Sequence, residues 1–397
     1  SPLRLSSEIT KGKKNCYAQF LLLLGRRFFC GMKAVVPDAQ PRKGRGDNEV
    51  FGEGENRDLL PPGVKGCRLS MIEGKGEDSP MHWRHKDLLD LDTLTVAEIE
   101  TILQTAGAMK EVLIRPLEKP PALRGKSVAL MFYENSTRTR SSFENAAKIL
   151  GAQVTNFAVA QSSVNKGESL LDTARTLQAM KIDLVVIRHA ASGAAEFLAK
   201  HLEAGVINGG DGQHAHPTQA LLDCFTLKEH LGGFRGKKIV IVGDILHSRV
   251  ARSNVIALTK LGAEVMLAGP PTLLPAEMKA LGVQTTYDLE SALPGADAVM
   301  ALRLQLERQR SGLLPSLREY SRLYMLTTER LARTGKKTFV LHPGPLNRGV
   351  EIASELADSA CSLIEEQVTN GVAVRMALIY LMLGGAGYAL DQECTPA

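Results

Sequence analysis

Short apolar runs alternate with amphipathic stretches through most of the chain, and this alternation constrains the fold more than any other feature. The expected strands are residues 127–133, 154–159, 183–187, 206–208, 238–242, 264–268, 298–302 and 338–341, and the expected helices are residues 136–150, 169–180, 193–202, 217–230, 250–261, 276–281 and 363–383. Strands separated by helices predict parallel sheets with helices on both faces. We therefore predict an α/β fold with two doubly wound parallel-sheet domains bridged by long helices. Ligands are expected at the carboxyl ends of the strands and between the domains.

The domain boundaries follow from where this pattern starts, restarts and ends. We expect a first domain at residues 83–232, a second at 233–370, and at 371–397 a C-terminal helix that packs back on the first domain, followed by a tail. Arg375 interrupts the apolar last helix, which favours a buried helix over a membrane span. Near the start of the first domain, Leu88, Leu89, Leu91, Leu94, Ile99, Ile102 and Leu103 predict helical segments, with Thr95 as an N-cap.

Residues 1–82 differ in composition from the rest. Up to residue 45 they hold ten basic and two acidic residues. Residues 46–80 are rich in Gly, Pro and charged residues, and they show neither the hydrophobic period of a helix nor that of a strand. We therefore expect this extension to be disordered. The apolar island Phe20–Leu24 is too short to cross a bilayer, and no secretory signal is found. An organellar targeting segment and an extension upstream of a start at Met71 or Met81 both remain open.

Charge and cysteine usage bound the class of protein. Residues 1–80 hold 14 Lys and Arg against 10 Asp and Glu, which leaves 34 against 33 in the rest of the chain. The main body therefore carries no electrostatic signal for nucleic acid or membrane, and neither is expected as a partner. The six cysteines are scattered without a C-x-x-C pair, which fits reduced thiols in the cytoplasm.

The junction between the first strand and its helix has the composition of a phosphate site. A strand followed at once by a helix leaves backbone N–H groups unpaired and aimed at one point, where the helix dipole favours an anion. Ser136, Thr137 and Thr139 add hydroxyl donors, and Arg138 and Arg140 add guanidinium groups suited to phosphate oxygens. The alternative is an N-cap beside two solvated arginines, but the combination favours a phosphate cradle.

Other polar clusters fall near the ends of expected strands. Arg188 directly follows a strand, and His216 and Gln219 stand at the entrance and in the first turn of a helix. Lys166 lies in a polar loop that is equally consistent with solvation. A His-x-His pair at 214 and 216 lacks a complete ligand set, so no metal is expected. A neutral imidazole that donates to a substrate carbonyl is the better interpretation of His216.

The second half of the chain places cations at strand ends as well. Arg249 lies between a strand and a helix, and Arg303 and Gln305 follow another strand. Two arginines at such positions suit a small dicarboxylate. The sequence His-Pro-Gly-Pro at residues 342–345 follows a third strand, and this turn either reverses the chain or presents backbone carbonyls to a ligand amine.

These motifs carry a resemblance to a known family. Residues 136–140, 166–168, 188–189, 216–219, 247–253, 303–308 and 342–345 occur in this order in aspartate carbamoyltransferase catalytic chains, and the similarity runs from about residue 85 to 384. Ornithine carbamoyltransferases share the phosphate turn and the His-Pro-x-Gln motif. They have His-Cys-Leu-Pro in place of residues 342–345 and lack the Arg303-x-Gln305 pair, so this chain resembles the aspartate side of the family.

The resemblance implies transfer of a carbamoyl group from carbamoyl phosphate to L-aspartate, in pyrimidine (UMP) synthesis and without a cofactor. It implies the following roles: Ser136, Thr137, Arg138, Thr139, Arg188, His216 and Gln219 bind carbamoyl phosphate; Lys166, Arg249, Arg303 and Gln305 bind aspartate; Gly344 and Pro345 approach both substrates through their backbone; and Arg138, Thr139, Lys166, Arg188, His216 and Gln219 are catalytic. Gly344 replaces a family Leu, which is expected to loosen one contact.

The resemblance also implies partners. Lys166 and Ser162 are expected to complete the active site of a neighbouring subunit, which makes a homotrimer with shared active sites the minimal active unit. Whether regulatory chains or a dihydroorotase partner bind this trimer is left open.

Two rival functions remain. Another carbamoyltransferase, acting on ornithine or a related amine, is disfavoured by Arg249 and Arg303. A catalytically idle scaffold subunit is disfavoured because Lys166, His216 and Gln219 are all present. A Rossmann dehydrogenase is excluded because neither first strand is followed by G-x-G-x-x-G.

Overall fold

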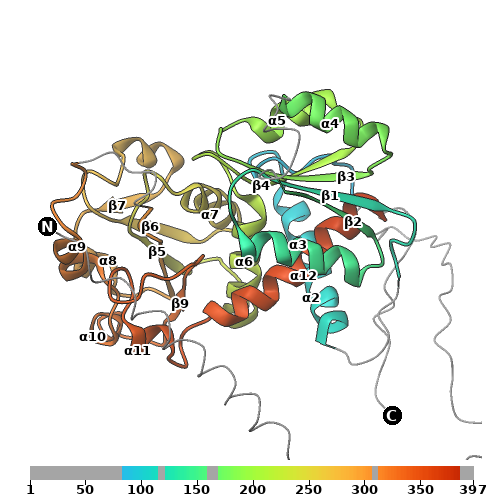
Figure 1. Ribbon diagram of the computed structural model, residues 1–397. Coiled ribbons are helices and arrows are strands. Elements are labelled where there is room, and N and C mark those ends of the chain that lie inside the picture. The colour runs from blue at the N-terminus through green and yellow to red at the C-terminus, as the bar shows by residue number, and fades with distance from the viewer. Residues whose placement is uncertain (1–82, 115–120, 159–168, 306–311, 385–397) are drawn as a thin grey trace, which may run out of the picture. The chain divides into compact units, whose positions relative to one another are not determined.

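The computed structural model of the protein describes residues 83–114, 121–158, 169–305 and 312–384 (Figure 1). The extension expected to be disordered at residues 1–82, the tail beyond residue 384, and the loop that carries Ser162 and Lys166 lie outside these ranges. Within the described ranges, no helix has both the length and the apolar character needed to cross a bilayer.

The first sheet consists of β1 (Ser127–Phe132), β2 (Gln153–Ala158), β3 (Leu184–His189) and β4 (Gly205–Asp211), in the order β2-β1-β3-β4. All neighbouring strands are parallel. Its helices are α2 (Val96–Ile114), α3 (Thr137–Ile149), α4 (Leu170–Ala179), α5 (Ala194–His201) and α6 (Pro217–Leu231).

Both faces of this sheet are covered, because successive side chains of a strand point to opposite sides. Leu130 of β1 belongs to a buried cluster with Ile102 of α2 and Phe143 of α3. Its neighbour Met131 belongs to a second cluster with Leu177 of α4 and Leu198 of α5. Figure 1 shows α4 and α5 on one face of the sheet and α2 and α3 on the other.

The second sheet consists of β5 (Lys238–Val242), β6 (Glu264–Ala268), β7 (Gln284–Thr286), β8 (Ala298–Ala301) and β9 (Phe339–Leu341), in the order β7-β6-β5-β8-β9. All neighbouring strands are again parallel. Ile241 of β5 packs in the same cluster as Leu258 of α7 (Arg249–Lys260), while Val240 faces a separate cluster. The prediction of two doubly wound parallel sheets is therefore confirmed.

Helix α12 (Ile364–Leu383) links the two sheets, because it contacts α2, α3 and α6 on one side and β9 on the other. Helix α6 also contacts α7. The predicted last helix at residues 363–383 is thus present, and the boundary expected at residue 370 falls inside it. Arg375 is buried within this helix, with 4% of the residue exposed.

Most predicted elements are observed, and Thr95 caps α2 as expected. The Glu98 backbone N–H donates to Thr95 Oγ1 at 3.2 Å, and the Thr95 backbone N–H donates to Glu98 Oε2 at 2.8 Å. These reciprocal bonds form a capping box, which fixes the first turn of the helix.

Three expectations about secondary structure were wrong or incomplete. Residues 88–94 are not helical, because Asp90 Oδ1 accepts from the backbone of Asp92 and Thr93, and Leu88 instead bridges Ile207. Residues 276–281 form a 3₁₀ helix rather than an α-helix. Strand β7 and the short helices α8 (Leu289–Ala292), α9 (Leu317–Tyr324), α10 (Thr328–Ala332) and α11 (Ser354–Ala357) were not predicted.

Candidate active site

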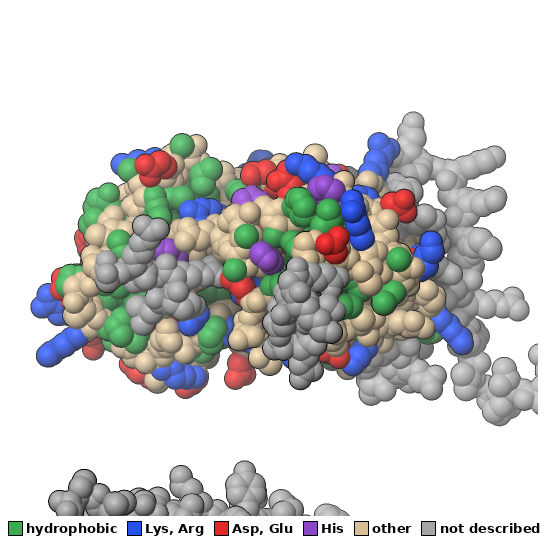
Figure 2. Space-filling model, turned by 45° about the horizontal axis from the view of Figure 1, so that its top comes forward, with side chains coloured by type: hydrophobic (Ala, Val, Ile, Leu, Met, Phe, Trp, Pro, Cys, Tyr) green, Lys and Arg blue, Asp and Glu red, His purple; other side chains and the backbone are tan. Residues whose placement is uncertain are grey.

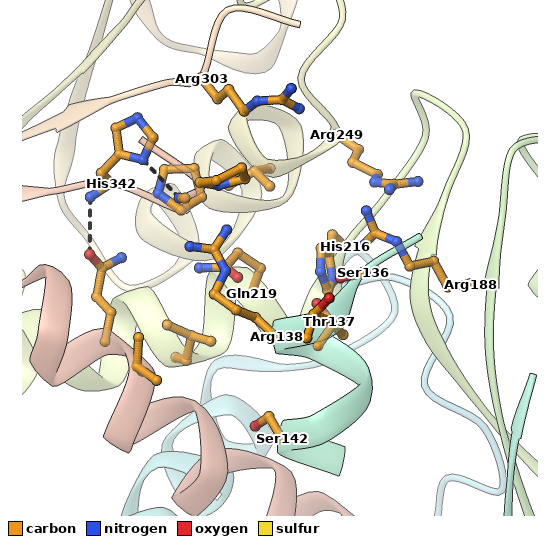
Figure 3. A pocket seen from close by; sticks show the side chains of 18 of the residues that line it. Ser136, Thr137, Arg138, Ser142, Arg188, His216, Gln219, Arg249, Arg303 and His342 are labelled. Carbon is orange, nitrogen blue, oxygen red and sulfur yellow. Dashed lines mark hydrogen bonds between the residues drawn. The ribbon is translucent and has the colours of Figure 1, made fainter. Parts of the chain in front are cut away.

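A pocket of about 740 Å³ lies where the carboxyl ends of strands from both sheets meet (Figure 3). This volume is typical of a small-molecule site. It is lined by Glu134, Asn135, Ser136, Thr137, Arg138, Thr139, Ser142, Arg188, His216, Gln219, Leu222, Ser248, Arg249, Val250, Arg303, Gln305, His342, Pro343, Gly344, Pro345, Ile364, Gln367, Val368 and Arg375. The structure thus brings together every predicted site residue that it describes except Arg140, and Ser162 and Lys166 lie outside the described residues.

The N-terminus of α3 forms one wall of the pocket. Ser136 is the N-cap of this helix, yet its side chain makes no capping hydrogen bond, so its hydroxyl stays available to a ligand. Thr137 and Arg138 follow in the first turn, and Thr139 is buried behind them. The backbone N–H groups of this turn and the helix dipole favour an anion at this point.

Only one of the two arginines of this turn lines the pocket. Arg138 does, whereas Arg140 is not part of the lining. Two residues along an α-helix correspond to a rotation of about 200°, so the two side chains leave the helix in opposite directions. The expectation that both guanidinium groups serve the cradle was therefore wrong for Arg140. Partial burial, and then the charge of Arg303, lower the pKa of Arg138 from its ordinary value.

A glutamate joins two of the predicted site arginines. Glu134 Oε2 lies 3.3 Å from Arg188 Nε and 2.5 Å from Arg249 Nη2. Arg188 Nη1 also donates to the Gly209 carbonyl at 3.2 Å, and Arg249 Nη1 donates to the Gly212 carbonyl at 3.2 Å. These contacts hold both guanidinium groups in fixed orientations at the pocket wall, where Figure 3 shows them turned toward each other.

Gly210 explains how two arginines come so close to β4. A Cβ atom at this position would lie 2.9 Å from Arg249 Cζ and 3.1 Å from Arg188 Nη1. Its φ of 117° is also one that side-chain-bearing residues rarely adopt. Glycine at 210 therefore makes the space in which the two guanidinium groups meet.

Helix α6 positions His216 and Gln219 as predicted. His216 is the N-cap and Pro217 occupies the first turn. The backbone N–H of His216 donates to Ser253 Oγ of α7 at 2.9 Å, so the start of α6 is tied to the second sheet's domain. Gln219 follows one turn later, with its amide nitrogen donating to Asp223 Oδ1 at 2.9 Å.

Arg303 and Gln305 follow β8, and the turn at residues 342–345 follows β9. Within this turn the Gly344 backbone N–H donates to His342 Nδ1 at 2.7 Å, so Nδ1 acts as an acceptor and the ring proton is on Nε2. Nε2 lies 3.2 Å from Glu351 Oε1 and donates to it. Burial lowers the pKa of His342, in keeping with this neutral form. The histidine therefore holds the turn in place from behind.

The electrostatics of the pocket favour anions. Among its described lining residues are five arginines, at positions 138, 188, 249, 303 and 375, against one carboxylate, Glu134. Burial lowers the pKa of Arg375 to about 10, which still leaves it charged at neutral pH. By contrast, basic and acidic side chains of the described residues are interspersed on the outer face drawn in Figure 2. Within the described ranges, no group of three His, Cys, Asp or Glu could hold a metal ion.

The sequence analysis missed several lining residues. Glu134, Ser142, Gln367 and Arg375 were not assigned to the site. Of these residues, only Arg375 had a signal in the sequence that could have placed it in the site, because it is a charged residue inside an apolar helix. Gln367 is an ordinary residue on a helix face, and no sequence pattern distinguishes it.

Comparison with known proteins agrees with this geometry. Residues 86–229 match the model of the carbamoyl-phosphate-binding domain of aspartate/ornithine carbamoyltransferases, and residues 235–382 match that of the Asp/Orn-binding domain. Fold and site define a carbamoyltransferase, and the chain belongs to the aspartate/ornithine carbamoyltransferase family.

Individual relatives lie on the aspartate side. The chain is 68% identical over 305 residues to the aspartate carbamoyltransferase catalytic subunit of Desulfitobacterium hafniense, covering 77% of this chain and 98% of that protein. It is 61% identical over 306 residues to the corresponding subunit of Moorella thermoacetica, covering 77% of this chain and 100% of that protein.

Solved structures match the fold of both branches. Aspartate transcarbamoylase from Trypanosoma cruzi, in complex with carbamoyl phosphate and aspartate, has a TM-score of 0.70 and 29% identity over 76% of this chain and 98% of its own. Ornithine carbamoyltransferase from Pyrococcus furiosus has a TM-score of 0.67 and 31% identity, over 77% of this chain and 98% of its own. The fold alone therefore does not distinguish the aspartate branch from the ornithine branch. The sequence relatives do, because they belong to the aspartate branch.

Proposed function

We propose that this protein is an aspartate carbamoyltransferase that transfers the carbamoyl group of carbamoyl phosphate to L-aspartate, giving N-carbamoyl-L-aspartate and phosphate for pyrimidine synthesis. The observation that carries the choice of amino acid is the position of Arg303 and Gln305 in the pocket, across from the α3 N-terminus. Their donors suit a second carboxylate on the acceptor. The ammonium group at the end of an ornithine side chain would meet a cation there instead.

In this proposal the first domain holds carbamoyl phosphate. Ser136, Thr137, Arg138, Thr139 and Arg188 bind the phosphate; Thr139, Arg188 and His216 donate to the carbonyl oxygen; and Gln219 binds the carbamoyl nitrogen. Arg188 is oriented for this role by Glu134 and the Gly209 carbonyl. The second domain holds aspartate through Arg249, Arg303 and Gln305, with Gly344 and Pro345 beside the reacting groups.

The reaction needs charge stabilisation at two places. Attack of the neutral amine on the carbamoyl carbon builds negative charge on the carbonyl oxygen, and then on the departing phosphate. Preorganised donors at both places lower the barrier, and the leaving phosphate accepts the amine proton. Thr139, Arg188 and His216 serve the first charge, and Arg138 with the α3 N-terminus serves the second. No covalent intermediate is required.

The assembly and compartment extend the proposal. We infer a homotrimer in which Lys166 and Ser162 reach the site of a neighbouring subunit, on the strength of the family resemblance in that loop. The cytoplasm is the proposed compartment, and the free thiols Cys224 and Cys361 support it.

The test is a carbamoyl-transfer assay on the purified protein that offers labelled carbamoyl phosphate with aspartate and with ornithine in parallel. Product from aspartate alone is expected. Product from ornithine would overturn the roles of Arg303 and Gln305, and product from neither acceptor would favour an idle subunit once the trimer has been shown to form.

A further inference from the structure

Behind the pocket wall lies a buried carboxylate that the reaction above does not use. Asp223 is fully buried on α6 and is not part of the pocket lining. Its Oδ1 accepts from Gln219 Nε2 at 2.9 Å and from Gln367 Nε2 at 2.7 Å, and its Oδ2 accepts from Asn254 Nδ2 at 2.8 Å. The three amides come from α6, α12 and α7 respectively.

An ionised carboxylate fixes which end of each amide faces it. It has acceptors only, so the amide nitrogen of Gln219 must point toward Asp223 and the amide oxygen must point away. The same holds for Gln367, whose oxygen accepts from the His342 backbone N–H at 3.0 Å. The oxygen and nitrogen ends of a glutamine amide have nearly the same shape, so only such partners decide its orientation.

The orientation of Gln219 determines what the pocket can recognise. Gln219 lines the pocket, and with its nitrogen held by Asp223 the end left for a ligand is an acceptor. An acceptor at this place suits the N–H groups of a carbamoyl group. The methyl group of an acetyl group offers this acceptor no hydrogen-bond donor. A site built to bind an N–H group discriminates strongly against the analogue that lacks it.

We propose that Asp223 is a positioning residue that holds the Gln219 amide with its oxygen toward the pocket, and thereby makes the site select carbamoyl phosphate over acyl phosphates. The inference rests on the proposed function, because it takes carbamoyl phosphate as the ligand. Through Gln367, the same carboxylate also ties Gln219 to the turn that starts at His342 in the other domain. Burial, partly offset by the hydrogen bonds from Asn254, Gln367 and Gln219, raises the pKa of Asp223 to about 6, so it is ionised above neutral pH.

The test compares two ligands that share the phosphate and differ at the group Gln219 faces. The dissociation constants of carbamoyl phosphate and acetyl phosphate are measured by calorimetry on the full-length protein, above pH 7 and without aspartate. In Asp223→Leu, the buried nitrogen of Gln219 loses its acceptor and turns toward the pocket. Affinity for carbamoyl phosphate should fall about tenfold, the size expected when a buried amide loses its partner, while affinity for acetyl phosphate changes by less than about twofold.

Two further variants separate positioning from folding. Asp223→Asn keeps one acceptor oxygen for the two glutamine nitrogens. It gives up the bond from Asn254, whose amide nitrogen still donates to the Val250 carbonyl, so most of the discrimination should be retained. The serine side chain of Asp223→Ser is too short to reach Gln219, so this variant should lose the discrimination between the two ligands as Asp223→Leu does. It replaces Asp223→Leu in the test if that variant does not fold. Asn254→Ala removes a different donor to Asp223 and should leave the ratio of the two dissociation constants unchanged.

The outcomes are distinct. The positioning role would be overturned if Asp223→Leu or Asp223→Ser bound both ligands more weakly by the same factor, or if neither affinity changed. An additional loss when Asp223→Leu is combined with Gln219→Ala would also overturn it, because the two residues would then act independently. Failure of the wild-type protein to carbamoylate aspartate would sink the proposed function instead, and the binding measurements would still decide the role of Asp223.

Discussion

The guanidinium group of Arg138 occupies the space into which a side chain at residue 344 would project. A Cβ atom placed on Gly344 would overlap Nη1, Cζ and Nη2 of Arg138, and the φ of Gly344 is 62°. The sequence comparison with the family suggested that glycine at 344 would only loosen a contact. The structure shows that this glycine makes room for the arginine of the phosphate cradle.

Gly344→Ala should therefore push aside the flexible end of Arg138 and lower kcat, but by less than Arg138→Ala does, because the guanidinium group can move away from the new Cβ atom. Gly349→Ala is the matched control. Gly349 has a φ of 80° in the same loop, but a Cβ there meets nothing within 4 Å. It should cost about 1 kcal/mol of stability through backbone strain and leave kcat unchanged. Equal kcat values for the two variants would contradict the steric explanation.

Arg138→Ala should lower kcat at least a hundredfold with no change in the fold, because removal of one preorganised donor costs about 2.7–4 kcal/mol of transition-state stabilisation. Arg140→Ala provides the control, since Arg140 leaves the same helix turn in another direction and does not line the pocket. Steady-state kinetics and circular dichroism check both variants. A near-wild-type rate for Arg138→Ala would refute the phosphate cradle.

Arg303→Ala should raise the KM for aspartate by more than about tenfold, because it removes a charged partner from a carboxylate. Binding of carbamoyl phosphate, measured by calorimetry in the absence of aspartate, should change little, since that ligand is assigned to the other domain. A large loss of carbamoyl phosphate affinity would show that Arg303 serves the phosphate side, where its charge already lowers the pKa of Arg138.

The stability of the protein should depend on pH through Asp223. Burial raises its pKa from 3.8 to about 6, so between these values the folded state binds more protons than the unfolded state. The contribution of Asp223 to the free energy of unfolding is therefore greatest below about pH 4 and falls as pH rises through about 6, by on the order of 3 kcal/mol in total.

Asp223→Asn removes this titration while keeping the side-chain shape. Relative to the wild type, its Tm should rise from about pH 4 to about pH 6 and then level off, because only the wild type acquires a buried charge across that range. Taking the difference between the two proteins cancels the other titrating groups they share. A difference in Tm that stays constant across this range would show that Asp223 keeps an ordinary pKa in the folded protein.

The sequence predicted what depends on neighbouring residues. The strand-to-helix turn at Ser136, the capping of α2 by Thr95 and the entrance of α6 at His216 all follow from local patterns, and all are observed. The phase of a helix was also available in principle, and it would have separated Arg138 from Arg140. Helices as short as α8 and α11 carry too few residues for their period to be recognised.

What the sequence could not give are contacts between distant elements. Glu134 faces Arg249 across 115 positions of sequence, and Gln367 reaches Asp223 across 144. Neither contact has a local signature, because each partner alone is an ordinary polar residue on a turn or a helix. Only the packing of α6, α7 and α12 around one pocket turns these residues into a site.

The proposed sharing of active sites between subunits leads to the last prediction. If Lys166 serves a neighbouring subunit, a Lys166→Ala chain and an Arg303→Ala chain each lack a different half of the site. Each variant alone should show little activity when the aspartate concentration is kept at the KM of the wild type, well below the raised KM of Arg303→Ala. Dissociating and reassembling the two together should restore activity, because some sites then combine an intact loop from one chain with an intact pocket from the other. The activity of the mixture, compared with each variant taken through the same procedure alone, checks this. No recovery, in a mixture shown by mass to contain hybrid trimers, would place Lys166 in the pocket of its own chain.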